Sequence, residues 1–157
     1  MASLVFSAPF KSVAITASTA RTVIGVKAAT NQAVKILEVA CSHDGATSSN
    51  APDVTDLNRC TFATNSPGTN STSLTLGNTK KDPGRAETVQ TTAAHSWSTE
   101  PTALTPYRSI NLAQYNGLYH YIVPFAAPWI VVGAQGFVVT MTSPNNVNAT
   151  GNIECEE

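Results

Sequence analysis

The sequence predicts an all-β domain, built as an antiparallel sandwich or barrel, and three observations support this prediction. Short runs rich in β-branched and aromatic residues recur along the chain, and most of the nine prolines fall between these runs. The runs do not alternate with helical patterns, as they would in a parallel sheet. Ser, Thr and Asn fill 47 of the 157 positions, a composition that suits the solvated faces and loops of sheets.

The first twelve residues, MASLVFSAPFKS, precede the first clear strand pattern. They have no basic residue before their short apolar stretch, so they do not resemble a secretion signal. We expect residues 1–12 to form an N-terminal arm or an edge strand, and residues 13–157 to form the sandwich.

Eight segments carry the clearest strand patterns. They are 13–16, 22–26, 33–40, 74–77, 88–97, 118–123, 129–132 and 136–142. In the fifth of these, the residues expected on one face are Val89, Thr91, Ala93, His95 and Trp97. The stretch 53–63 has no clean alternation, so its register stays open, and the polar stretches 42–52 and 65–72 predict long loops.

The segment 28–41 fits two patterns. Ala33, Ile36, Leu37 and Ala40 have helical spacing, whereas simple alternation places Val34, Ile36, Glu38 and Ala40 on one face of a strand. The β-branched residues at 34, 36 and 39 favour the strand.

The composition limits the possible partners. The formal net charge is −1 and 12% of the residues are charged, so the chain lacks the basic field that nucleic-acid binding usually requires. No apolar run approaches the roughly 20 residues of a membrane-spanning helix. The apolar content of 42% suffices for one folded core. We expect a single domain that binds neither nucleic acid nor membrane.

No arrangement of residues predicts catalysis or a metal site. The sequence contains no HxH, HExxH or GxSxG pattern. We expect His43 to lie in a solvated loop and His95 and His120 to lie on sheet faces. The protein is therefore predicted not to be an enzyme and to hold neither a cofactor nor a metal ion.

Two further groups of residues leave alternatives open. Cys41, Cys60 and Cys155 allow one disulfide, but three buried thiols in a reducing compartment are the favoured interpretation. The second group consists of the basic residues Lys80, Lys81 and Arg85 and the acidic residues Glu154, Glu156 and Glu157. These clusters form either an exposed turn and a polar tail, or opposite patches that meet between subunits or dock a charged partner.

Several short motifs resemble those of small structural proteins that decorate the capsids of tailed bacteriophages. The matching segments are Lys-Ile-Leu at 35–37, Asp-Gly at 44–45, Ala-Pro at 51–52, Asp-Leu-Asn-Arg at 56–59, Pro-Gly-Thr at 67–69, Glu-Thr-Val-Gln-Thr-Thr at 87–92, Glu-Pro-Thr at 100–102, Ile-Val-Pro-Phe at 122–125, Trp-Ile-Val-Val at 129–132, the glycines at 133 and 136, and the final Glu-Glu. The loop at 65–74 departs from the pattern because it is rich in Ser and Asn.

The resemblance implies a jelly-roll-like sandwich that cements a phage capsid. Such a protein would assemble with itself, commonly as a homotrimer, and bind the major capsid protein. It would be made in the cytoplasm of the bacterial host and reside on the exterior of the virion. The resemblance brings no catalytic residues.

Apolar anchors would carry such binding, since the cores of interfaces favour Phe, Tyr and Trp. The candidate anchors are Phe6, Phe10, Phe125 and Trp129. Each could instead be buried within its own subunit, and the N-terminal pair is the one we expect to be free.

Two other functions remain open. The first is a carbohydrate-binding jelly-roll module of a phage tail or secreted enzyme. It would use exposed aromatic rings, and the candidates are Tyr107, Tyr115, Tyr119 and Tyr121. The second is an unrecognised sandwich hydrolase.

Overall fold

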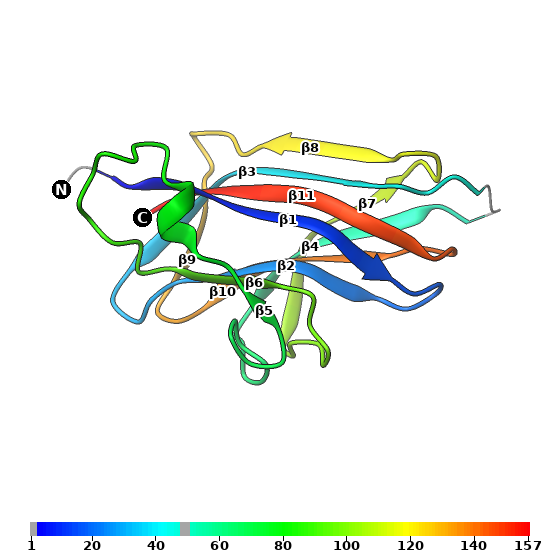
Figure 1. Ribbon diagram of the computed structural model, residues 1–157, viewed down its shortest axis with the longest axis horizontal. Helices are drawn as coiled ribbons and strands as arrows, with labels where there is room; N and C mark the ends of the chain where they lie inside the picture. Colours follow the sequence, from blue (N-terminus) through cyan, green and yellow to red (C-terminus); the bar gives the residue numbers. More distant parts are fainter. Residues whose placement is uncertain (1–2, 48–50) are drawn as a thin grey trace.

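The structure, a computed structural model, describes residues 3–47 and 51–157. Two antiparallel sheets face each other across a hydrophobic core, as predicted (Figure 1). The strands are β1 (Val5–Ile15), β2 (Arg21–Lys27), β3 (Ala33–His43), β4 (Asp53–Cys60), β5 (Thr72–Ser73), β6 (Thr92–His95), β7 (Leu104–Leu112), β8 (Leu118–Ile122), β9 (Trp129–Val132), β10 (Gly136–Thr142) and β11 (Val147–Glu156). A 3₁₀-helix, η1 (Leu76–Thr79), follows β5. Within the described ranges, no helix is long and apolar enough to cross a membrane.

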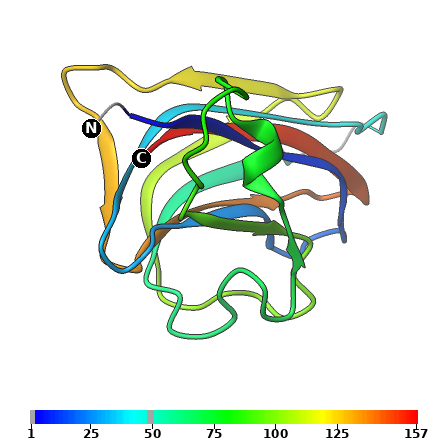
Figure 2. The ribbon, with the colours of Figure 1, turned by 60° about the vertical axis from the view of Figure 1, so that its left-hand side comes forward.

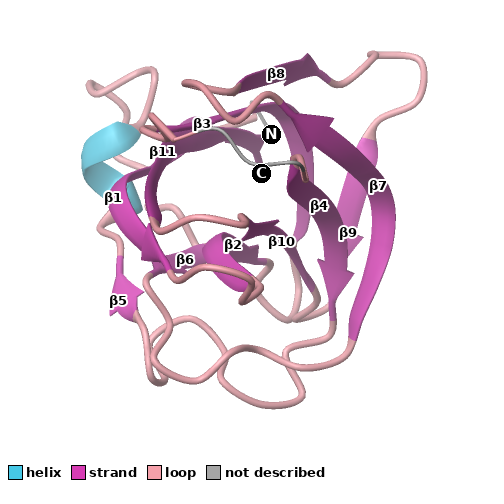
Figure 3. Cartoon of the chain, turned by 90° about the vertical axis from the view of Figure 1, so that its right-hand side faces the viewer, coloured by secondary structure: helices cyan, strands magenta, loops and turns pink. Residues whose placement is uncertain are grey.

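The strand order makes the sandwich jelly-roll-like. The first sheet has the order β1-β11-β3-β8, with β9 also paired to β3, and the second has the order β5-β6-β2-β10-β4-β7. The pairs are therefore nested: β1 with β11, β2 with β10, β3 with β8 and β4 with β7. Figure 3 shows the strands of the two sheets surrounding the core.

Residues 5–12 belong to β1, at one edge of the first sheet, and do not extend away as an arm. Phe6 and Phe10 point inward and are 0% and 3% exposed, because their positions pair with Cys155 and Gly151 on the buried face of β11. A bulge between Phe10 and Val13, with Ser12 at φ 54°, keeps Val13 and Ile15 in the core as well. Residues 1 and 2 lie outside the described ranges.

Residues 33–43 form a strand, as the β-branched residues favoured, but the simple alternation predicted for it is wrong. Glu38 pairs with Glu154 and Ile36 with Cys155, so Leu37 is an extra residue in the ladder. Such a bulge reverses the faces that follow it. Val34 and Ile36 face the core before it, and Val39 and Cys41 face the core after it.

The outer face of the second sheet carries a small core of its own. Its members are Cys60, Phe62, Ala94, Trp97 and Val138. The segments 61–71 and 96–103 close over this face (Figure 2). The indole Nε1 of Trp97 donates to the carbonyl of Asn65 at 2.8 Å. The predicted loop at 65–72 is therefore partly a cover.

The predicted strand at 88–97 is shorter and ends differently from the expectation. Only 92–95 pair as β6, and Ser96 has a φ of 54°. This left-handed residue turns Trp97 to the side of Ala94, away from Ala93, which faces the main core. The prediction that Ala93 and Trp97 share a face is wrong for this reason.

Strands β4 and β7 lie in segments whose structure the sequence left open. Strand β4 falls in the stretch 53–63, whose register was ambiguous, and β7 falls in a segment without a predicted strand. In β4, Leu57 faces the main core, whereas Cys60 belongs to the outer cluster. Strand β7 carried no clear pattern and contains Pro106, which cannot donate to a ladder. It is tolerated because β7 is the edge of its sheet, and a bulge at Tyr107 accompanies it.

The three cysteines are buried and unpaired, in agreement with the favoured interpretation. Burial raises the pKa of the Cys41 thiol to about 12 and also raises the pKa of Cys60 and Cys155. All three are therefore protonated and shielded in the folded protein.

We expect the folded protein to resist Ellman's reagent and to release three equivalents of thiol once guanidinium unfolds it, because the attacking thiolate does not form in the core. The measurement is absorbance during a denaturant titration. Rapid reaction of one thiol below the unfolding transition would contradict the burial described above.

We expect Gly136→Ala to destabilise the fold by about 1–3 kcal/mol, the usual cost of overpacking. A Cβ at Gly136 would overlap the carbonyl oxygen of Val26 and the ring of Phe62. The matched control is Gly77→Ala, because a Cβ there meets nothing within 4 Å. Denaturant unfolding should show a lower midpoint for the first variant alone, and equal midpoints would contradict the packing.

Candidate functional site

Five large apolar side chains form an exposed ridge along one edge of the first sheet. They are Leu118, Ile122, Phe125, Ile130 and Val132, with exposed fractions of 69%, 66%, 97%, 45% and 47%. We call this set the apolar ridge. Single apolar residues are common on protein surfaces, and His120 lies between Leu118 and Ile122 on this face. Five large apolar residues along one sheet edge make that edge the candidate site of interaction.

The ridge follows from the pairing of two short strands with β3. Strand β8 pairs with residues 38–42, and β9 pairs with residues 33–36. Because side chains alternate along a strand, Tyr119 and Tyr121 face inward and the residues between and beside them face outward. The same rule turns Val131 inward and its neighbours Ile130 and Val132 outward.

Phe125 lies on a tight turn between β8 and β9. The amide of Ala127 donates to the carbonyl of Pro124 at 3.0 Å, and Pro128 follows. The amide of Val123 donates to Leu37 O at 2.8 Å and fixes the start of the turn. Proline restricts the backbone on both sides, so the 97% exposed ring of Phe125 is held on a preorganised support.

Stacked aromatic rings form the layer beneath the ridge. Trp129 stacks on Tyr107 at a centroid distance of 5.7 Å and on Tyr121 at 5.2 Å. Tyr121 also stacks on Tyr119 at 6.2 Å, and the guanidinium of Arg108 lies 4.7 Å from its ring centroid. These rings stiffen β7, β8 and β9 against one another. They also occupy one another's faces, which a sugar would need for stacking.

The charges on this outer face are paired within the chain. Glu38 and Glu154 lie opposite each other on adjacent strands, and each carboxylate contacts a further side chain. His120 lies 2.9 Å from Glu38, and Lys81 lies 3.0 Å from Glu154. Lys81 of the basic cluster thus pairs with Glu154 inside one subunit, an arrangement that neither sequence interpretation proposed.

The structure separates the four predicted anchors into two pairs. Phe6 and Phe10 are core residues, so they are not presented to a partner. Their burial has the physical reason given above: β1 pairs with β11 over its whole length. Phe125 and Trp129 lie at the same edge of the first sheet, with Phe125 exposed and Trp129 half-buried in the aromatic layer.

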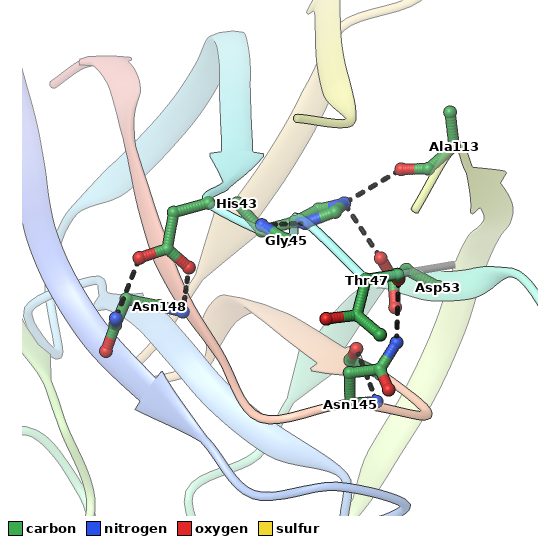
Figure 4. A network of polar contacts seen from close by, with 9 residues as sticks. His43, Gly45, Thr47, Asp53, Ala113, Asn145 and Asn148 are labelled. Atoms are coloured by element: carbon green, nitrogen blue, oxygen red, sulfur yellow. Dashed lines mark hydrogen bonds and ion pairs between the residues drawn. The ribbon is translucent and has the colours of Figure 1, made fainter. Parts of the chain in front are cut away.

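The expected solvated loop at His43 is wrong. His43 ends β3, where it pairs with Ala149, and its side chain is 0% exposed. Its Nδ1 accepts the amide of Gly45 at 3.2 Å, which places the ring proton on Nε2. Nε2 lies 2.8 Å from Asp53 Oδ2 and 3.0 Å from the carbonyl of Ala113 (Figure 4). Both ring nitrogens are engaged, so His43 joins the ends of three segments.

Asp44, next to His43, is solvent-exposed and organises the adjoining turn. Its carboxylate accepts the amide and the side chain of Asn148 at 2.6 and 2.8 Å. The side-chain hydrogen bond from Asn148, followed by that from its backbone, holds the pKa of Asp44 below its ordinary value. Asp44 lines a polar cavity of about 330 Å³.

The other histidines lie on sheets, as expected. His95 is in β6, with Nδ1 2.8 Å from Ser96 Oγ, and partial burial lowers its pKa. His120 is in β8 beside the ridge. Over the ranges that the structure describes, no group of three or more His, Cys, Asp and Glu is placed to hold a metal ion.

Four of the five ridge residues were not among the predicted anchors. The sequence contained a usable signal for these residues. In both 118–122 and 129–132, apolar or aromatic residues occur on both faces of the strand. Both faces being apolar indicates a strand covered on both sides. Only the structure shows that one of these faces is open.

No family model matches the chain, and no curated protein is significantly similar to it.

We expect Asp44→Ala to lower stability by about 1 kcal/mol near neutral pH, the scale of an exposed charge-assisted hydrogen bond. Because the folded pKa lies below the unfolded value near 3.9, this contribution is full above that value. It disappears as the pH falls through the folded pKa. Denaturant unfolding at pH 7 and pH 2 tests this, and an equal difference between the two proteins at both pH values would contradict it.

Proposed function

We propose that this protein is a homo-oligomeric structural protein that decorates and cements a phage capsid. The observation that carries self-association is the apolar ridge, in which five large side chains remain in water. Fully burying each Leu, Ile or Phe is worth roughly 1.5–3 kcal/mol. A second copy of the chain is always present in a solution of the protein, so it is an available partner for this surface.

The surroundings of the ridge favour a stable, rigid assembly. The aromatic layer beneath it fixes the strands that carry it, so little conformational freedom is lost on association. Glu156 and Glu154 pair with Lys35 and Lys81, and Glu38 lies against His120, so covering this face need not bury an unpartnered carboxylate.

Binding to the major capsid protein rests on the resemblance of the short motifs described above, and so does a homotrimer as the oligomer. A stiff, neutral sandwich suits a repeated position on a virion surface. The carbohydrate-binding alternative has weaker support, because three of its four tyrosines stack on neighbouring rings.

We expect light scattering after size exclusion to show an oligomer, and Ile122→Asp with Ile130→Asp to yield a folded monomer. A buried carboxylate in an apolar interface is strongly unfavourable. The matched control is Tyr115→Asp, which alters an aromatic residue 59% exposed in the segment between β7 and β8. A wild-type monomer, or an oligomer that survives in the ridge variant, would contradict self-association through the ridge.

Cosedimentation with purified expanded phage shells tests the capsid role. We expect the wild-type oligomer to pellet with shells in a saturable amount and to remain in solution alone. Failure to bind shells, together with retention on a glycan array, would replace the capsid role with carbohydrate binding.

A further inference from the structure

We propose that Phe125 of one copy inserts into a groove on the first sheet of a second copy, so that subunits join head to tail. This inference rests on the proposed self-association and specifies how it occurs.

The groove lies across the outer face of the first sheet, beside the ridge. Its volume is about 590 Å³. Leu4, Ala33 and Ile130 supply its apolar lining, and the other nine lining residues are polar or charged. A closed cavity of about 150 Å³ already accommodates a benzene ring. The groove therefore has room for a phenyl ring together with the residues that flank it.

The charged groups that line the groove already have partners within the chain. Lys35 Nζ lies 3.3 Å from Glu156, and the Arg85 guanidinium lies 2.7 Å from Glu87. The hydrogen bond from Arg85 lowers the pKa of Glu87 to about 2. Glu157 accepts hydrogen bonds from the amides of Gln90 and Thr91. A charged ligand would have to displace these partners, so the groove fits an uncharged, apolar occupant.

The segment 123–128, Val-Pro-Phe-Ala-Ala-Pro, has that chemistry. It carries no charged side chain, and its turn presents Phe125 almost fully to solvent. At 97% exposure, Phe125 does not occupy the groove of its own copy. Ile130 belongs to both the ridge and the groove lining, so the two surfaces are continuous.

The two halves of this contact are different surfaces of the same chain. Each copy offers one Phe125 and one groove, which makes the interface heterologous. A heterologous interface closes into a ring when its rotation permits, and a homotrimer is one such ring.

Cross-linking tests the pairing. Ala126→Cys, which is exposed beside Phe125 and leaves the ring in place, and Ala33→Cys are made separately, carried on differently tagged chains, co-expressed and oxidised with copper phenanthroline. Because the three native cysteines are buried, the introduced thiols are the ones that react. We expect non-reducing gels to show disulfide-linked dimers that contain both tags, and each variant expressed alone to give none.

Every other outcome of this experiment overturns the pairing. Dimers formed by Ala126→Cys alone would show a symmetric contact instead. An oligomer without any mixed cross-link would leave self-association standing and remove the groove as the partner of Phe125. A monomer would overturn both the pairing and the proposed function.

A second variant measures the contribution of the ring. We expect Phe125→Ser to weaken self-association at least 30-fold in analytical ultracentrifugation, the effect of losing an interface hot spot, and Tyr115→Ser to leave it unchanged. An oligomer of unaltered affinity that no longer binds shells would overturn the pairing and assign Phe125 to the capsid contact.

Discussion

The hydrogen bonding of β3 to two short strands on the same edge determines the character of the exposed face. Strand β8 pairs with residues 38–42 of β3, and β9 pairs with residues 33–36 of β3. The bulged Leu37 lies between these two paired segments. The chain must leave the sheet after β8 and rejoin it at Trp129, and Leu37 O receives the amide of Val123 where it leaves. Val123 is still buried, but residues 124–128 of this turn are exposed, Phe125 among them. The ridge and the aromatic layer both follow from this shared edge.

The two outer faces of the sandwich differ in how they are covered. Over the second sheet, the segments 61–71 and 96–103 supply Phe62 and Trp97 and enclose a small core. The described residues offer no such cover for the edge of the first sheet formed by β8 and β9, where apolar side chains face water. This asymmetry distinguishes a closed face from an open one, and the proposed contacts use the open one.

Much of the architecture could be predicted from the sequence, because strand length, β-branching and proline positions are local properties. The failures have a common cause in long-range pairing. Leu37 and Ser96 reverse the alternation at single residues, and only the partner strand or the backbone angle reveals this. His43 lies in a polar stretch, yet its pairing with Ala149 draws it inside. The sequence also could not show which face of β8 and β9 is exposed, because a strand with apolar residues on both faces has the same composition whether one face or neither is open to solvent.

The pairing of β1 with β11 also governs how the chain can acquire its structure. Val5 lies beside Glu156, so the first strand finds its neighbour about 150 residues later. Such high contact order slows folding, because loop closure must precede the contacts that reward it. During synthesis, Phe6 and Phe10 have no place to pack until β11 has emerged from the ribosome. Chains in this interval expose the side chains of the future core, which makes them prone to aggregate before the fold is complete.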